Sequence, residues 1–441
     1  MCFWINGIVS FLLDIQNPTA YNEINNRKRA IQNGTFRKEG LKKMDEDKSK
    51  NRQYVKYIRR EQEMERRRRQ VRMYKALIFF MLGLTVLGAI HTWKMSRRMQ
   101  KAGVKQEKTA TKEQDKQTSG EGMQEQQTSE ETEEKLPAQT EILMSFTGDC
   151  ILGTDENFLW ETGFNAYYES YGGTYFFQNV KHIFEADDLT IVNMEGTLTE
   201  ETTREYKQFA FKGEPRFVDI LTNGSVEAAN MANNHSHDYG QKSFEDTVSI
   251  LEQNNIRTFG YDDIAVMEVK GVKVGMFGIY ELDDHLERIP QLQQNIAKLK
   301  ARKVDIIVGV FHWSNELVTV PDANQITLGH MAVELGADIV VGHHPHVVQG
   351  IEEYQGKTIA YSLGNFCFGG NTHPQEMDTM ILQQKFVLSE DREIIDTQTT
   401  VIPCSVSSDV SYNNYQPTVL EGDAAASCME RIDSRSAAIT Y

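Results

Sequence analysis

The chain has 441 residues, of which 40% are hydrophobic and 25% charged, so it is long enough for a large folded core with appended segments. Its formal net charge of −16 is unevenly distributed, because the first hundred residues are strongly basic and the remainder is acidic. An acidic domain does not attract nucleic acid or another polyanion by bulk electrostatics, so an anionic ligand would need a local positive centre such as a metal ion. Five scattered cysteines without CxxC spacing exclude a cysteine zinc cluster and disfavour a disulfide framework.

Residues 1–75 form a basic segment that we expect to be cytoplasmic. The apolar run near its start is too short to span a membrane and lacks the basic beginning of a signal peptide. Two interpretations of residues 1–43 stay open. Translation could begin at Met44, because codons for residues 38–40 can form a ribosome-binding-like stretch, or residues 1–43 could be a genuine cytoplasmic extension.

An apolar stretch, residues 76–93, predicts a single transmembrane helix. It contains no Asp, Glu, Lys or Arg, and at helical rise it spans close to the roughly 30 Å hydrocarbon core of a bilayer. Basic residues flank both ends, which disfavours the alternative of a buried helix in a soluble domain. Nine Lys and Arg in residues 56–75, against seven in residues 94–113, favour a cytoplasmic N-terminus. No cleavage site follows, so we expect an uncleaved signal anchor in the cell membrane with the C-terminal domain outside the cell.

The remaining chain divides into a linker, a folded domain and a tail. Residues 94–140 are polar and predict a disordered linker. From residue 141 onward, apolar strand-like runs alternate with amphipathic helical segments, which predicts an α/β domain over residues 141–420. The predicted strands are Ile142–Phe146, Leu189–Val192, Val272–Ile279, Val304–Phe311 and Asp338–Val341, and the predicted helices are Ser243–Asn254 and Ile326–Leu335. We expect residues 421–441 to form a weakly structured C-terminal tail.

Five apolar runs each lead into a loop that carries potential metal ligands. In chain order these residues are Asp149, Glu195, Asn234 with its neighbour His235, His312, and the group His343, His344 and His346. Open α/β sheets place binding sites beyond the carboxyl ends of their strands, so we expect these loops to converge on one crevice. Oxygen and imidazole ligands without a thiolate suit Mn²⁺, Fe or Zn²⁺ better than Ca²⁺.

Each of these residues has a purely structural alternative when taken alone. Asp149 could cap a turn or a helix, Glu195 could be a solvated loop residue, and His312 could be a hydrogen-bonded interior histidine. The NNH tripeptide at 233–235 could be plain turn chemistry. The GHHPH cluster at 342–346 is harder to explain structurally. Five such loops in sequence, each after a strand, favour a metal site.

The order of the motifs resembles the CapA family of bacterial capsule synthesis proteins, which belongs to the calcineurin-like metallophosphoesterase superfamily. The motifs that carry the resemblance are GD (148–149), NME (193–195), NNHSHDYG (233–240), FHW (311–313), GADIVVGHHPHVVQG (336–350) and YSLGNF (361–366). The resemblance covers about residues 141–420. It implies a four-layer α/β/β/α sandwich of metallophosphoesterase type with a metal centre at its edge.

The resemblance also implies roles for individual residues. The implied metal ligands are Asp149, Glu195, Asn234, His312, His344 and His346. Glu195 takes the place of the bridging carboxylate. The superfamily's GHxH pattern fits the histidine run in two registers, and we prefer the register that leaves His343 out. His235, oriented by Asp238, resembles the catalytic group that donates a proton to a leaving group or stabilises transition-state charge.

Two departures from the superfamily pattern affect this prediction. The superfamily begins with DxH, whereas position 151 is Ile, so one expected ligand is absent. Glu195 stands where an aspartate is usual, which lengthens the bridging arm by one methylene. We therefore expect a divalent metal centre of one or two ions, with Mn, Fe or Zn the best match.

Two functions follow from the resemblance. The first is a membrane-anchored capsule (poly-γ-glutamate) biosynthesis protein with a metal-dependent, phosphoesterase-like hydrolase domain outside the cell. The alternative is a non-catalytic polymer-binding and assembly factor that uses the same site. Either function implies the same partners: an anionic surface polymer or its precursor, the membrane and capsule synthase subunits, and no nucleic acid.

Overall fold

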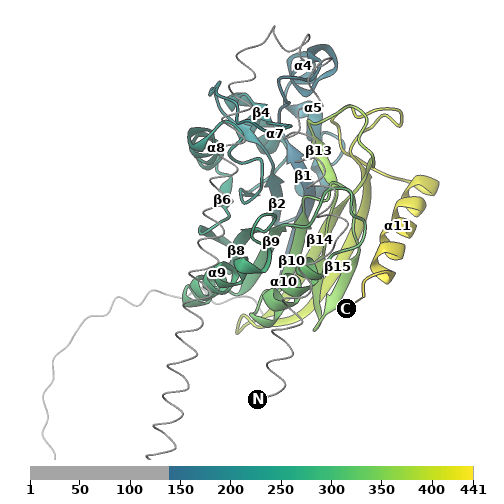
Figure 1. Cartoon of the computed structure of the whole chain (residues 1–441). Coiled ribbons are helices and arrows are strands. Elements are labelled where there is room, and N and C mark those ends of the chain that lie inside the picture. Colours follow the sequence, from purple (N-terminus) through teal and green to yellow (C-terminus); the bar gives the residue numbers. More distant parts are fainter. Residues whose placement is uncertain (1–138, 441) are drawn as a thin grey trace, which may run out of the picture. The chain divides into compact units, whose positions relative to one another are not determined.

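The computed structural model describes residues 139–440, which fold into two β-sheets with helices around them (Figure 1). In spatial order the strands of the first sheet are β16 (Thr418–Val419), β15 (Ile394–Ser405), β14 (Asp378–Ser389), β1 (Gln139–Ile151), β2 (Leu189–Met194), β5 (Ala228–Asn230) and β6 (Arg257–Phe259), with β13 (Asn365–Phe368) paired to β1. Those of the second sheet are β11 (Ile351–Tyr354), β12 (Lys357–Ala360), β10 (Ile339–His343), β9 (Ile306–His312), β8 (Val272–Tyr280) and β7 (Ile264–Val269). A separate short pair consists of β3 (Thr197–Leu198) and β4 (Lys212–Gly213).

The two sheets pack against each other across one apolar core. Its fully buried side chains include Ile142 and Met144 from β1, Val274 and Met276 from β8, and Val308 from β9. Successive residues of a strand face opposite sides of the sheet, so these side chains fill the space between the sheets while their neighbours point outward. Because the central strands are covered on both faces, they appear in the sequence as near-continuous apolar runs.

Helices cover the outer face of each sheet. On the first sheet lie α4 (Phe164–Tyr171), α5 (Thr174–Phe177), α6 (Lys181–Phe184), α7 (Val218–Asn223) and α8 (Gln241–Gln253). On the second lie α9 (Ile289–Ala301) and α10 (Ala323–Glu334). Short 3₁₀ turns are η1 (Trp160–Thr162), η2 (Pro215–Phe217) and η3 (His285–Arg288). The order of the layers is therefore helices, sheet, sheet, helices.

The predicted α/β class is confirmed. All five predicted strands are present as β1, β2, β8, β9 and β10, and the two predicted helices are α8 and α10. Helix α10 begins at a capping box, in which the Asp322 carboxylate accepts from the backbone N–H of Gln325 and the Gln325 side chain accepts from the backbone N–H of Asp322. This pair satisfies backbone donors that the first turn of a helix leaves free.

The expected weakly structured tail is instead a helix, α11 (Gly422–Ala437). Cys428 and Ile432 on one of its faces are buried in the core between the sheets, and the helix lies beside β15 and β11 (Figure 1). The prediction of a weakly structured tail is wrong because α11 has few large apolar residues, and only two of its sixteen residues are fully buried.

The basic segment, the apolar stretch 76–93 and most of the polar linker lie outside the described residues, so the predictions made for them stay predictions. Among residues 139–440, none of the helices has the length and apolar character required to cross a bilayer.

Parallel pairing brings the carboxyl ends of the central strands to one edge of the sandwich. In the first sheet, Asp149 of β1 lies opposite Asn193 of β2, and Asn193 lies opposite Asn230 of β5. In the second sheet, His312 at the end of β9 lies opposite His343 at the end of β10. The loops that follow these strands therefore start side by side, as expected from the sequence.

Candidate metal centre

Two groups of ionisable side chains meet at this edge. Asp149, Glu195 and His312 offer ligand atoms that all lie within 4.8 Å of one another, and so do Glu195, His344 and His346. Glu195 belongs to both groups and is fully buried. Two ligand sets that share one carboxylate are the arrangement expected of a bridged pair of metal positions.

Several ligand atoms in this cluster have no hydrogen-bond partner. Both carboxylate oxygens of Glu195 are buried without one, and so is the Nδ1 atom of His344. A buried polar atom left unpaired costs about 1–3 kcal/mol, so folded proteins rarely retain several in one place. Unpaired oxygen and imidazole nitrogen atoms that converge on one point fit a bound divalent cation. The residues present therefore suit the metal that the sequence predicts.

Asp149 holds the histidine loop against β1. Its two carboxylate oxygens lie 3.2 Å from His343 Nδ1 and 3.1 Å from His346 Nδ1, and the backbone N–H of His344 donates to Oδ2 at 3.3 Å. The side chain of Asn193 donates to Oδ1 at 2.9 Å. Burial alone would raise the pKa of Asp149, but His343 and His346 reverse this and hold it well below its usual value. The carboxylate is thus kept ionised inside the protein.

His312 is fixed by amide groups on both ring nitrogens. Its Nε2 lies 2.7 Å from Asn234 Oδ1 and 3.5 Å from Glu195 Oε1, while its Nδ1 lies 3.4 Å from Asn193 Nδ2. Asn193 also accepts from the side chain of Asn230 at 2.9 Å. A chain of amides across β2 and β5 therefore orients both Asp149 and His312, as the hydrogen-bond partners of metal ligands commonly do.

The backbone of the His-Pro-His segment adopts unusual conformations. His344 and His346 both have positive φ values, 95° and 57°. Such conformations cost non-glycine residues on the order of 1–3 kcal/mol each and persist where the surrounding structure enforces them. Backbone strain at two candidate ligands in one segment indicates that this conformation serves the site and not the stability of the segment.

Burial dominates the electrostatics of the cluster. It raises the pKa of Glu195 well above its usual value, with the nearby Asp149 carboxylate adding to the effect. It lowers the pKa of His344 to about 3 and that of His312 well below the usual value. Burial also opposes a charge on His346, but Glu195 and Asp149 outweigh it and raise the pKa of this residue to about 9. A cation placed among these groups would favour the ionised form of Glu195 and the neutral histidines.

A second cluster lies beside the first and contains His235 and Asp238. His235 Nδ1 lies 2.6 Å from Asp238 Oδ2, so the opposite ring nitrogen is left for a ligand. Lys207 donates to Asp238 Oδ1 at 2.6 Å and to the Asn234 carbonyl at 2.8 Å, and its Nζ lies 3.2 Å from His235 Nδ1. Burial lowers the pKa of His235 despite the neighbouring carboxylate, so the imidazole is neutral near pH 7.

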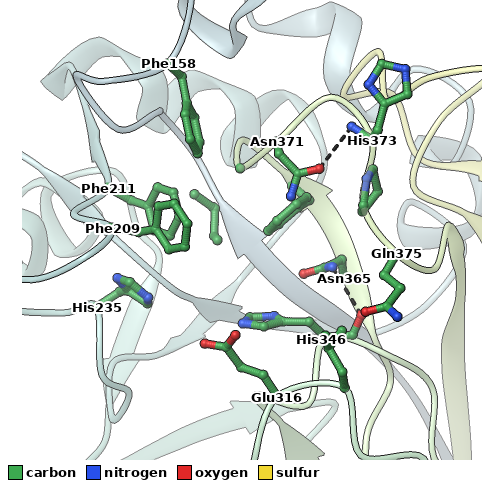
Figure 2. A pocket seen from close by; sticks show the side chains of 15 residues that line it. Phe158, Phe209, Phe211, His235, Glu316, His346, Asn365, Asn371, His373 and Gln375 are labelled. Atoms are coloured by element: carbon green, nitrogen blue, oxygen red, sulfur yellow. Dashed lines mark hydrogen bonds between the residues drawn. The ribbon is translucent and has the colours of Figure 1, made fainter.

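A cavity of about 300 Å³ opens beside both clusters (Figure 2). His235 and His346 face it from the metal side, together with Glu316. Phenylalanines form one wall, and the segment from Asn365 to Gln375 forms another. The cavity is large enough for part of a substrate and adjoins the candidate ligands.

Comparison with known proteins identifies the family of the chain. The family described as "Bacterial capsule synthesis protein PGA_cap" matches residues 143–370, which include every predicted site residue. The chain belongs to this family. It is 30% identical over 247 residues to "PGA biosynthesis protein CapA" of Bacillus subtilis (strain 168), covering 51% of this chain and 62% of that protein.

Two further proteins are similar to the chain. "Capsule biosynthesis protein CapA" of Bacillus anthracis is 28% identical, over 52% of this chain and 60% of that protein. "Probable polyglutamine synthesis accessory protein Rv0574c" of Mycobacterium tuberculosis (strain ATCC 25618 / H37Rv) is 24% identical, over 41% of this chain and 55% of that protein. The match thus spans about 60% of the length of the two Bacillus relatives.

Within the family-matched region, the structure brings the eight predicted site residues to one edge of the sandwich. Their individual roles as ligands or as acid and base stay predictions. The candidate ligand groups contain His344 and His346, while His343 contacts Asp149, and the preferred register stays a prediction. Sequence reasoning missed Asn193 and Lys207. Asn193 is the first residue of the NME motif and could have been noticed there, but Lys207 lies in a polar loop without any motif.

Proposed function

We propose that this protein is a membrane-anchored accessory factor of poly-γ-glutamate capsule biosynthesis, and that its C-terminal domain is a metal-dependent hydrolase-like domain outside the cell. Family membership and the names of the Bacillus relatives support the capsule role. The apolar stretch 76–93 and its basic flanks support the membrane anchor. The partners are an anionic surface polymer or its precursor and the synthase subunits of the same membrane.

The observation that carries the hydrolase-like assignment is the position of Glu195. Its two oxygens are buried, lack hydrogen-bond partners and lie within reach of both ligand groups. A structural carboxylate in this position would be paired with a donor, because leaving it unpaired is costly. We therefore assign one or two divalent ions to the site, held by Asp149, Glu195 and His312 and by Glu195, His344 and His346, with Asn234 beside His312. The order of layers supports a sandwich of metallophosphoesterase type.

Different residues of the chain have different roles in the proposed hydrolysis. A bound divalent ion supplies positive charge for an anionic substrate oxygen and makes water more acidic. Asp149 and Asn193 keep the histidine loop and His312 in place. Asp238 holds the proton of His235 on Nδ1, so that Nε2 can accept a proton or, once protonated, give it to a leaving group. Lys207 fixes Asp238 and the carbonyl of Asn234 together.

A non-catalytic polymer-binding role is the second candidate, and Ile151 favours it. This residue occupies the position where the superfamily has a ligand histidine, and it lines the cavity as a buried apolar side chain. One metal position therefore has a ligand fewer than expected. A site weakened in this way could hold an anionic polymer without cleaving it.

Metal analysis of the purified full-length protein tests the proposal. We expect at least one equivalent of Mn, Fe or Zn in the wild type and a loss of most of it in Glu195→Gln and His344→Ala. His182→Ala, an exposed histidine on α6, is the matched control and should retain the metal. Hydrolysis of a generic phosphodiester, measured on the same samples, separates the two candidates. A metal-containing protein without turnover that binds the polymer supports the assembly role, and a metal-free wild type refutes both.

A further inference from the structure

The segment that follows β9 carries Glu316 to the cavity beside the metal centre. On one side of this residue, the backbone N–H of Trp313 donates to the carbonyl of His343 at 3.2 Å. On the other side, the backbone N–H of Leu317 donates to the carbonyl of Pro345 at 2.8 Å. Residues 313–317 are therefore bonded at both ends to the loop that carries the candidate histidine ligands.

The backbone of this segment is strained. Ser314 and Leu317 have positive φ values of 69° and 63°. Such conformations are unfavourable for non-glycine residues and persist where the surrounding structure enforces them. Here the buried carboxylate of Glu281 accepts the backbone N–H of Ser314 at 3.1 Å, and the carboxylate of Asp322 accepts its hydroxyl at 2.9 Å. The surrounding structure therefore holds Glu316 in one place, which an ordinary solvated loop residue does not require.

The carboxylate of Glu316 is exposed and lines the cavity. Figure 2 shows it beside the ring of His346, on the side of the cavity where His235 also lies. Within residues 139–440 it has neither a hydrogen-bond partner nor an ion-pair partner, and it lies outside both candidate ligand groups. An ionised carboxylate only accepts hydrogen bonds, so this one is complementary to an N–H or O–H group of a ligand.

The cavity provides no lysine or arginine for this carboxylate among the described residues that line it. The nearby ammonium group of Lys207 is bonded to Asp238 and to the carbonyl of Asn234. His346 is a candidate metal ligand, and a histidine that binds a metal through its ring is neutral. A second anionic group of a substrate would therefore meet Glu316 without a counter-charge, whereas a hydroxyl or an ammonium group would be stabilised.

An aromatic wall borders the same cavity. Phe209 and Phe211 lie nearly parallel, with interplanar angle 9° and ring centroids 6.2 Å apart, and Phe158 packs against Phe209 with centroids 5.8 Å apart (Figure 2). Phe209 is 38% exposed. Aromatic faces bind methylene groups and attract a cationic neighbour rather than an anionic one. The wall thus suits the uncharged part of a ligand whose hydrogen-bond donor reaches Glu316.

We propose that Glu316 is a specificity residue, whose carboxylate binds a hydroxyl or ammonium group that the substrate carries close to the anionic group held at the metal centre. The inference rests on the proposed function, because it takes the metal centre as the place of that anionic group. The favoured substrates are phosphoesters of an amino alcohol or a polyol, and a second anionic group in this position is disfavoured. The proposal concerns the hydrolase-like site alone and assigns no part of the polymer to the cavity.

Binding of three matched phosphonates to the full-length protein tests the role of Glu316. Aminopropylphosphonate, hydroxypropylphosphonate and butylphosphonate have the same length, end in an ammonium, a hydroxyl and a methyl group, and contain a C–P bond that is not hydrolysed. Calorimetry should show the wild type binding the first two about 3- to 10-fold more tightly than butylphosphonate, the range of one net hydrogen bond.

Three variants assign this preference to the carboxylate. Glu316→Ala should bind all three phosphonates alike. Glu316→Gln should keep the preference for the hydroxyl, which its amide can still bind, and lose most of the preference for the ammonium, because the negative charge is gone. The control Glu353→Ala changes an exposed glutamate on β11 outside the cavity and should keep both preferences.

Metal content measured on the same samples separates this role from the proposed function. A wild type that holds metal and binds the three phosphonates equally, or binds none of them, overturns the specificity role and leaves the proposed function intact, whereas a wild type without metal overturns both. A preference for only one of the two donors supports the role and identifies the group. Loss of metal in Glu316→Ala would show that Glu316 is a metal ligand and would overturn the role. Should that variant fail to fold, Glu316→Gln decides, since an unchanged preference for the ammonium would contradict the proposal.

Discussion

The guanidinium of Arg435 on α11 binds the carboxylate of Glu376 with two hydrogen bonds. The Nη1–Oε1 distance is 2.8 Å and the Nη2–Oε2 distance is 2.7 Å. Glu376 also accepts the backbone N–H of Val348 at 2.9 Å, and Arg435 donates to the carbonyl of the same residue. Val348 comes two residues after His346, so the C-terminal helix is tied directly to the loop that carries the candidate ligands. Bidentate arginine–carboxylate pairs combine strength with fixed geometry.

We expect Arg435→Ala to destabilise the protein by about 3 kcal/mol, because it leaves the buried Glu376 with only the more exposed Arg431 as a charge partner. The variant should also lose metal more readily, since the His346 loop is released. Arg431→Ala is the matched control. Its side chain is 39% exposed, against 15% for Arg435, so its contact with Glu376 contributes at most about 1 kcal/mol. Chemical denaturation and metal analysis of both variants check this, and equal losses would contradict it.

Removal of divalent ions should lower the melting temperature of the wild type, and added Mn²⁺ or Zn²⁺ should restore it. A ligand that binds only the folded state stabilises by about 2.7 kcal/mol at a hundredfold excess over its Kd. Glu195→Gln should respond differently. Without metal it should melt no lower than the metal-free wild type, because it removes a buried carboxylate next to Asp149, and added metal should not stabilise it. Equal stabilisation of both proteins by metal would contradict the assigned ligands.

His235→Ala should lower phosphodiester turnover by about 10²–10⁴-fold, the usual contribution of a positioned acid or base, and leave the metal content unchanged. His237→Ala is the control from the same loop, because the His237 ring stacks on Phe244 with centroids 4.5 Å apart, away from the site. A similar loss of turnover in both variants would indicate damage to the loop rather than loss of an acid–base group.

Stability should fall between about pH 5 and pH 8 because of two carboxyl groups near the start of β2. Burial raises the pKa of Asp187 to about 6 and that of Glu227 to about 7. The usual value of such groups is about 4, so the folded state keeps protons that the unfolded state has released. The stabilisation is complete below about pH 4 and is lost as the pH rises through these raised values.

Glu227→Gln should therefore reduce the difference in unfolding free energy between pH 5 and pH 8. The Gln side chain can still accept the backbone N–H of Thr190, which donates to Glu227 at 2.8 Å. The unfolding free energies should be measured by denaturation with a chelator present, so that pH-dependent metal binding does not contribute to the difference. The exposed Glu161→Gln variant should keep the difference found in the wild type, and an unchanged difference in Glu227→Gln would disprove the assignment.

The central strands and the loops that follow them were predictable from the sequence. Strands buried on both faces appear in the sequence as nearly continuous apolar runs. The run Ile142–Phe146 is apolar except for Ser145 because β1 lies in the middle of its sheet, and the candidate ligands follow because parallel strands end at one edge. The preferred register of the candidate histidine ligands came only from the resemblance. The direction of each histidine side chain in this run depends on the positive φ values of His344 and His346, which cannot be read from the sequence.

Other parts of the site could not be predicted because they depend on distant contacts. Lys207 lies in a loop without periodicity and reaches Asp238 only in the folded chain. The role of α11 depends on one arginine near its end, which the sequence presents as an ordinary surface charge.

The bond between Arg435 and Glu376 also shows that residues beyond the family match belong to this domain. The family match stops at residue 370, yet both partners of the bond lie beyond it. The segment after residue 370 is therefore bonded directly to the loop that carries His346. A protease cut between β16 and α11 would therefore affect the site, because it would separate Arg435 from the rest of the chain, and with it the bond to Glu376.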